Sequence, residues 1–302
     1  MRVIDEEKII ENIKNISKKN EIIMVLKDNA YGVGICRMVN IAKICNIKRI
    51  AVKTIDEGIL VRFLYRECEI LVLGKINKSQ IKEVKKHNLI PTINDYSDYV
   101  IFKDNGIKSH LEIDAGMNRF GIKNNYLAII NDPIVDKIYI HIYDEGEINK
   151  IEFIKRISKR FNKPFHIGGS IVLEHSSDII RVGKAMYSGA LSFYGTITNI
   201  KKVYQGETVG YDKCYYANSD CWIGICDVGY KNGLSIQYNG KVYINGNYYS
   251  IVGKSCMDHV FVLINENVSI GDKVEFLGAN ISEKDFLHWN KMTFYEALLF
   301  LN

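Results

Sequence analysis

Short apolar runs recur at nearly constant intervals in the first third of the chain. Runs such as EIIMVLK and RIAVKT begin at residues 21, 49, 69, 89 and 109, so successive starts lie 28, 20, 20 and 20 residues apart. The segments between them, for example residues 56–68 and 79–88, have apolar residues three and four positions apart and charged residues elsewhere. This is the periodicity of helices that cover a sheet with one face. The spacing therefore predicts a repeated strand–helix unit with parallel strands.

Three further apolar runs, less regular than the first five, begin at residues 137, 163 and 178 and bring the predicted strands to eight. Eight strand–helix units predict a (β/α)8 barrel of the TIM type. From about residue 195 the pattern changes to short alternating strands separated by the turn sequences KNG, YNG and NGN. We therefore expect an α/β chain, with a barrel over residues 1–194 followed by a mainly-β domain over residues 195–302.

Composition and charge exclude several classes of protein. No run approaches the ~18 apolar residues of a membrane span, and the first twenty residues carry charges where a secretion signal is apolar. We therefore expect a cytoplasmic protein that contacts no membrane. The formal charge is +5, but the lysines are scattered, which argues against nucleic-acid binding. The seven cysteines are odd in number and lack CxxC spacing, so neither a disulfide framework nor a metal site is expected.

Several predicted strands end in polar residues. Lys27 closes the run IIMVLK, Arg119 follows LEID, and His141, Gly168–Ser170 and Arg181 close or follow later runs. In barrels of this type the chemistry lies at the C-terminal ends of the strands. A strand-end lysine can form a Schiff base with a carbonyl, and a basic loop can hold a phosphate, which together indicate a phosphorylated aldehyde cofactor. Periodicity alone leaves open that Lys27 is an ordinary strand-end lysine.

Sequence motifs consistent with such a cofactor occur along almost the whole chain. Among them are IIMVLKDNAYGVG (22–34), EIDAGMNRFG (112–121), IRVGKAMYSGAL (180–191), VGYDKCYYA (209–217) and IVGKSCMD (251–258). In this order they resemble the alanine racemase family, of fold type III. The resemblance implies an enzyme that uses pyridoxal 5'-phosphate (PLP) on a small amino acid. It also implies an N-terminal barrel, a C-terminal β domain, and a head-to-tail homodimer whose sites combine residues of both chains.

The resemblance implies a racemase with two bases. Lys27 is similar to the lysine that binds PLP covalently and acts on one face of the substrate Cα. Tyr211 resembles the tyrosine that the partner chain contributes to the other face. One base removes the proton and the other returns it with inverted configuration, while PLP accepts the electron pair. Because the reference pKa of tyrosine is about 10, such a base needs neighbours that lower it, and His141, His166 and Arg181 are placed for that.

The resemblance assigns further residues by motif. Arg181 is expected to face the pyridine nitrogen and to leave it unprotonated, because a guanidinium keeps its own protons. Arg119 is expected to bind the substrate carboxylate. The other expected cofactor contacts are Tyr31, His166, Ser170 and Gly183. The other expected substrate-binding and supporting residues are Met257, Tyr230, His141, Glu112 and Asp258.

The sequence departs from the family pattern in four places. Glu112 stands where many members have a lysine that becomes carbamylated to hold the arginine seven residues later, so we expect the glutamate to provide that anion directly. Gly169 replaces the asparagine that precedes the serine, and GYKNG (229–233) replaces GYADG. The chain stops at Asn302, before the segment in which the family carries a further tyrosine to the phosphate, which predicts weaker PLP binding.

Three functions are open at this point. Interconversion of L- and D-alanine is expected first, with serine or a broader specificity as variants. A non-catalytic PLP-binding relative is the second, although a binding protein needs no second base such as Tyr211. A decarboxylase is the third, although such relatives have longer chains and a different C-terminal constellation.

Overall fold

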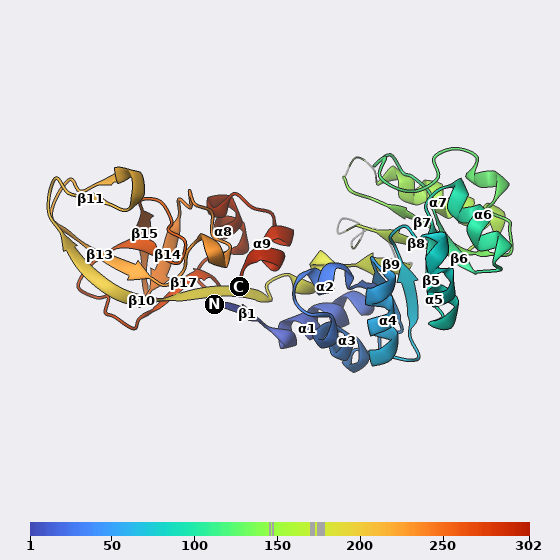
Figure 1. The fold of residues 1–302 in the computed structure, drawn as a ribbon, viewed down its shortest axis with the longest axis horizontal. Helices are drawn as coiled ribbons and strands as arrows, with labels where there is room; N and C mark the ends of the chain where they lie inside the picture. The colour runs from blue at the N-terminus through green and yellow to red at the C-terminus, as the bar shows by residue number, and fades with distance from the viewer. Residues whose placement is uncertain (145, 147, 170–172, 174–178) are drawn as a thin grey trace. The chain divides into compact units, whose positions relative to one another are not determined.

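The structure is a computed structural model that describes residues 1–144, 146, 148–169, 173 and 179–302. The chain divides into two compact units, Ile9–Tyr187 and a second unit made of Met1–Lys8 with Ser188–Asn302 (Figure 1). Strand β10 (Leu191–Val203) belongs to the second unit and spans the boundary predicted after residue 194. The ranges 1–194 and 195–302 therefore stay a prediction of where the domains divide.

Within the described residues, strands β2 to β9 form a closed barrel of eight parallel strands, which confirms the predicted (β/α)8 fold. The strands are β2 (Glu21–Val25), β3 (Arg49–Val52), β4 (Glu69–Val72), β5 (Ile90–Ile93), β6 (Ser109–Glu112), β7 (Val135–His141), β8 (Phe165–Gly168) and β9 (Ile179–Val182). Most strand residues are buried, and in β6 all four are. Such continuous burial is typical of parallel strands that are covered on both faces.

Helices follow most of these strands along the chain (Figure 1). They are α1 (Glu6–Ser17), α2 (Lys27–Tyr31), α3 (Ile35–Ile44), α4 (Ile55–Leu64), α5 (Ile81–Lys86), α6 (Tyr96–Asp104) and α7 (Asn149–Phe161). Helix α4 begins with a capping box, in which Thr54 Oγ1 accepts from the Glu57 amide at 3.2 Å and the Glu57 carboxylate accepts from the Thr54 amide. This cap stops the chain from extending β3 and turns it back over the barrel. None of the helices in the described part of the chain has the length and apolar content to cross a bilayer.

The second unit confirms the predicted mainly-β domain. Among its described residues one sheet has the strand order β1-β10-β13-β16-β15-β14-β17, and β17 also pairs with β10. Its elements are β1 (Arg2–Ile4), β10, β11 (Thr208–Val209), β12 (Tyr215–Tyr216), β13 (Cys221–Cys226), β14 (Lys241–Ile244), β15 (Asn247–Val252), β16 (Val260–Ile264), β17 (Lys273–Leu277), α8 (Glu283–Asn290) and α9 (Phe294–Phe300). Phe193 of β10 packs on Phe276 of β17 and Phe286 of α8, with ring centroids 5.6 and 6.3 Å apart.

Candidate active site

The barrel topology brings the predicted strand-end residues to one rim. Glu112, His141 and Gly168 are the last residues of β6, β7 and β8, and Lys27 follows β2 after one intervening residue. In the sheet ladder His141 lies opposite Gly168, and Gly168 lies opposite Arg181. Because all the strands are parallel, these side chains share the C-terminal mouth, where barrels of this type place their chemistry.

Lys27 is a half-buried amine at this mouth. Burial lowers its pKa most, and the positive charges of Arg119 and Lys53 lower it further. The carboxylate of Asp28 acts in the opposite direction. A lowered pKa increases the fraction of neutral amine near pH 7, and the neutral amine is the form that attacks a carbonyl. The environment of Lys27 therefore suits a nucleophile better than an ordinary surface lysine would.

Four residues after Lys27 adopt left-handed backbone conformations. Their φ angles are 53°, 52°, 54° and 57° over residues 28–31. For residues other than glycine this conformation costs about 1–2 kcal/mol each. Hydrogen bonds hold the turn: the Ala30 carbonyl accepts from the Tyr187 hydroxyl at 3.1 Å, and Asn29 Oδ1 accepts from the Ile35 amide at 2.9 Å. Strain held in place by surrounding contacts is characteristic of functional sites.

The turn places Tyr31 against the loop that follows β9. A Cβ atom at Gly183 would lie 2.4 Å from the Tyr31 hydroxyl oxygen, so the hydroxyl rests directly on the Gly183 backbone. The ring of Tyr31 packs edge-on against Tyr187, with centroids 5.8 Å apart. Tyr31 and Gly183, both predicted phosphate contacts, therefore lie together, in a space that only a glycine leaves open.

Arg181 is fixed inside the barrel by three contacts. Its Nη1 lies 2.6 Å from His166 Nδ1, and its Nη2 donates to the Ile140 carbonyl at 3.1 Å. The guanidinium carbon lies 4.1 Å from the centroid of the Tyr139 ring. A Cβ at Gly168 would lie 2.3 Å from Arg181 Nη2, so a side chain there would displace the guanidinium. Arg181 is thus held with its charge in a defined position.

Glu112 is a buried carboxylate, only 7% exposed. Its Oε2 accepts a hydrogen bond from the Tyr139 hydroxyl at 3.0 Å. Burial raises the pKa of Glu112, while the positive charges of Arg181 and Arg119 act to lower it. Glu112 is therefore an interior carboxylate whose pKa depends on the charges of both arginines.

Arg119 and His141 line one small hollow together with Glu112. Within the described residues Arg119 forms no ion pair with Glu112, whose carboxylate instead accepts from Tyr139, so the expected direct anion–arginine contact is absent from this single chain. Burial lowers the pKa of His141 to about 3, and Arg181 and Arg119 contribute to the same shift. His141 is therefore neutral near pH 7, and Arg119 is the cation exposed at this hollow.

The predicted residues of the C-terminal unit lie on two connected loops and one separate turn. The Tyr230 amide donates to the Cys256 carbonyl, and the Lys231 amide donates to the Met257 carbonyl, both at 2.9 Å. Tyr230 and Met257 are therefore held side by side. Asp258 pairs with His259 Nδ1 at 2.7 Å. Tyr211 begins the turn of residues 211–213, and its side chain is 69% exposed.

Two positions near β8 stand apart from the rest. Ser170, a predicted phosphate contact, lies outside the described residues. Gly169 has φ 135°, and a Cβ there would lie 2.1 Å from the Ile142 carbonyl oxygen. This backbone conformation therefore requires glycine at position 169, where the family pattern has asparagine.

Sequence reasoning missed two interior residues, Tyr139 and His110. Both are essentially inaccessible to solvent. Each precedes a predicted site residue by two positions on the same strand, Tyr139 before His141 and His110 before Glu112. Side chains two apart on a strand share a face, so this spacing was the available signal.

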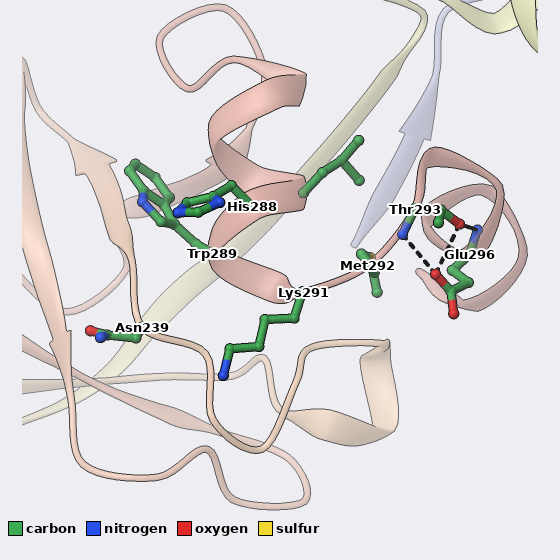
Figure 2. Close-up of a pocket in the computed structure, with 8 residues that line it drawn as sticks. Asn239, His288, Trp289, Lys291, Met292, Thr293 and Glu296 are labelled. Carbon is green, nitrogen blue, oxygen red and sulfur yellow. Dashed lines mark hydrogen bonds between the residues drawn. The ribbon is translucent and has the colours of Figure 1, made fainter. Parts of the chain in front are cut away.

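A surface pocket in the described residues lies elsewhere. It has a volume of about 540 Å³ and lies on the C-terminal unit between α8 and α9 (Figure 2). Figure 2 shows Trp289, Lys291 and Glu296 among the residues that line it. None of the predicted site residues lines it, so we do not assign the reaction to this pocket.

Comparisons with known proteins agree with the fold and the motifs. The sequence model described as "Alanine racemase, N-terminal domain" matches residues 4–190, and that described as "Alanine racemase, C-terminal domain" matches residues 190–302. The alanine racemase of Listeria innocua is 28% identical, over 99% of this chain and 91% of that protein. The alanine racemase of Aquifex aeolicus is 28% identical, over 90% of this chain and 87% of that protein.

Among solved structures, the alanine racemase from Bartonella henselae with covalently bound pyridoxal phosphate has a TM-score of 0.90. It is 20% identical, and the match covers 100% of this chain and 97% of that one. At this identity the likeness shows the fold. The two sequence models together span the chain from residue 4 to its last residue. The chain therefore belongs to the alanine racemase family.

Proposed function

We propose that this chain is a PLP-dependent alanine racemase. The observation that carries the proposal is the barrel mouth, which combines a lysine of lowered pKa with a buried, fixed arginine. The contact between the Tyr31 hydroxyl and the Gly183 backbone supports PLP in particular, because it brings two expected phosphate contacts together, at a place where a Cβ at residue 183 would collide with the hydroxyl. The residues present fit the cofactor on which the family depends.

The roles of the residues follow from their chemistry. Lys27 would hold PLP covalently, Tyr31 and the backbone at Gly183 would bind its phosphate, and Arg181 would face its ring nitrogen. PLP, when bound, supplies an electron sink for the pair left behind when the substrate Cα loses its proton. Arg181 donates hydrogen bonds without giving up a proton, and its contact with His166 keeps it in one orientation. Arg119 would bind the carboxylate of a small amino acid at the mouth.

Racemisation needs a proton acceptor on each face of the substrate Cα. The amine of Lys27 takes or returns the proton on one face. The hydroxyl of Tyr211 would do so on the other face, contributed by a second copy of the chain. The exposure of Tyr211 supports this role, because the side chain is not packed in the core of its own unit. We therefore also propose a head-to-tail homodimer. We propose a cytoplasmic location as well.

The proposal is tested by product analysis. Purified protein with added PLP is incubated with L-alanine in D2O, and alanine is analysed by chiral chromatography and mass spectrometry. We expect the mixture to approach equal amounts of L- and D-alanine, with deuterium at Cα of the product. A parallel incubation with L-serine defines the specificity. If neither amino acid yields its D-form while PLP is bound, the protein is a non-catalytic relative.

Replacing Glu112 with glutamine is expected to raise KM for alanine about three- to tenfold, with a smaller effect on PLP binding. The substitution keeps the shape of the side chain but removes the negative charge that acts on Arg119. Tyr139→Phe is the matched control, because it removes the hydrogen bond to Glu112 and leaves the charge. Steady-state kinetics of the two variants separate these effects. An unchanged KM in Glu112→Gln, or an equal rise of KM in Tyr139→Phe, would contradict a role for the charge.

A further inference from the structure

Two histidines and an arginine form a connected row inside the barrel. His166 of β8 lies between Arg181 of β9 and His110 of β6. Arg181 Nη1 is 2.6 Å from His166 Nδ1, and His166 Nε2 is 2.9 Å from His110 Nδ1. Both histidines have no solvent exposure, and Arg181 is 6% exposed. The resemblance of the motifs covers His166 and Arg181 but assigns nothing to His110.

The arginine determines where the protons of both histidines lie. A guanidinium can only donate, so His166 Nδ1 has to accept and its single proton is on Nε2. The Nε2–H group then donates to His110 Nδ1, which must be an acceptor. The proton of His110 is therefore on its own Nε2. One fixed donor thus sets the tautomers of two rings in series.

The far end of the row faces two carboxylates and a lysine amine. His110 Nε2 has no hydrogen-bond partner in the described residues. It lies 3.9 Å from Glu69 Oε1 and 3.8 Å from Asp136 Oδ2, and the amine of Lys137 bridges those two carboxylates at 3.2 and 3.0 Å. Carboxylates at this distance favour a proton on Nε2 over a lone pair there. Arg181 at one end of the row and the carboxylates at the other therefore favour the same tautomers, with the proton on Nε2 of both histidines.

We propose that His110 is a positioning residue for Arg181, acting through His166. By accepting the proton of His166 Nε2, His110 fixes the ring that receives Arg181 Nη1, and so fixes the guanidinium that would face the PLP ring nitrogen. This inference rests on the proposed function for its consequence in catalysis. The hydrogen-bonded row itself does not depend on that function.

The surroundings of the row support this role. The His166 ring stacks on Tyr139 with centroids 4.7 Å apart and planes at 21°, which prevents it from turning to another partner. Burial lowers the pKa of His110 to about 3, with Lys137, Arg181 and Arg49 acting in the same direction and Asp136 against it. The pKa of His166 is lowered as well, mainly by burial and next by Arg181. Both rings stay neutral, and a second proton on either would replace an acceptor of the row by a donor.

The test compares two substitutions of His110. His110→Leu removes the acceptor, whereas His110→Asn keeps an acceptor oxygen at the position of Nδ1. The full chain is labelled with 15N-histidine, and the nitrogens of His166 are followed by NMR with PLP bound and after its removal. The rate at which bound PLP is lost is measured in parallel by absorbance. Circular dichroism and the melting temperature confirm that both variants are folded.

In the unsubstituted protein we expect His166 to carry its proton on Nε2, with Nδ1 unprotonated. In His110→Leu we expect a second His166 signal with a protonated Nδ1, because a buried Nε2–H without an acceptor is unfavourable. That tautomer cannot accept the hydrogen bond from Arg181, so the guanidinium that would face the PLP ring nitrogen is no longer fixed. We therefore expect PLP to be lost roughly tenfold faster. The asparagine variant should match the unsubstituted protein in both measurements.

Three results would overturn the proposal. One is a proton on His166 Nδ1 in the unsubstituted protein, which needs no variant to detect. The second is an unchanged His166 spectrum in His110→Leu. The third is equally fast loss of PLP from the leucine and asparagine variants. Failure of the proposed function would instead appear as absence of D-alanine in the product assay, whatever the His166 nitrogens show.

Discussion

Replacing Lys27 with alanine is expected to abolish covalent attachment of PLP and to lower kcat for alanine racemisation by at least about a thousandfold. The variant loses both the amine that binds the cofactor and the base for one face of the substrate. The half-buried position of Lys27, which lowers the pKa of its amine, favours the neutral nucleophile at this place in the barrel. No change elsewhere in the mouth is expected to remove both functions at once.

Borohydride reduction followed by peptide mapping measures the attachment. The unsubstituted protein should carry the label on Lys27, and the variant should carry none. Lys75→Ala is the matched control, because Lys75 also follows a barrel strand, β4, and pairs with Asp98 at 3.2 Å. Although burial favours the neutral form of Lys75, hydrogen bonds to Asp95 and Asp98 raise its pKa. A label on any lysine other than Lys27 in the unsubstituted protein would refute the assignment.

Tyr211→Phe is expected to lower racemisation by about two to four orders of magnitude and to leave PLP attachment intact. Phenylalanine keeps the ring but has no oxygen to carry the proton. Because Tyr211 is 69% exposed, the change should not disturb the core of its unit, and the melting temperature should stay the same. Loss of PLP attachment together with activity would mean that Tyr211 has a structural role.

Mixing the two inactive variants tests whether the site is shared between chains. Random re-pairing of Lys27→Ala with Tyr211→Phe chains makes half of the dimers mixed. In each mixed dimer one site has neither residue and the other has both, so about one quarter of the original activity should return. If Tyr211 served Lys27 of its own chain, no mixed dimer would contain a complete site, and the mixture would stay inactive.

The strands of the barrel were predictable because parallel strands covered on both faces leave continuous apolar runs. The predicted starts at residues 21, 49, 69 and 109 coincide with the first residues of β2, β3, β4 and β6. The position of the site at one rim of the barrel was predictable from the same apolar runs, since parallel strands bring their C-terminal ends together. Arg181 and Lys27 could therefore be placed at one mouth without coordinates.

Other features depend on the backbone and on distances across the barrel. The left-handed turn over residues 28–31 is made of Asp, Asn, Ala and Tyr. Asp and Asn tolerate a positive φ, but Ala and Tyr do so rarely, so the sequence does not predict four such residues in a row. The contact of His110 with His166 joins strands that are not neighbours and residues that lie 56 positions apart. The close approach of the Ile142 carbonyl to Gly169 is likewise visible only in the structure. Sequence periodicity assigns residues to faces but does not report which of them touch.

The pairing of β1 with β10 has a consequence for the order in which the protein can be made. Val3 lies opposite Ser192, so β1 and β10 are neighbours in one sheet. In the sequence, all the residues of the barrel strands lie between these two strands. At the usual rates of translation the ribosome needs roughly 10 to 40 s to synthesise the intervening residues. During this time β1, a strand of three residues, has emerged but has no partner strand. The barrel can fold while the chain is still growing, whereas the sheet that contains the first residues has to wait for the last ones.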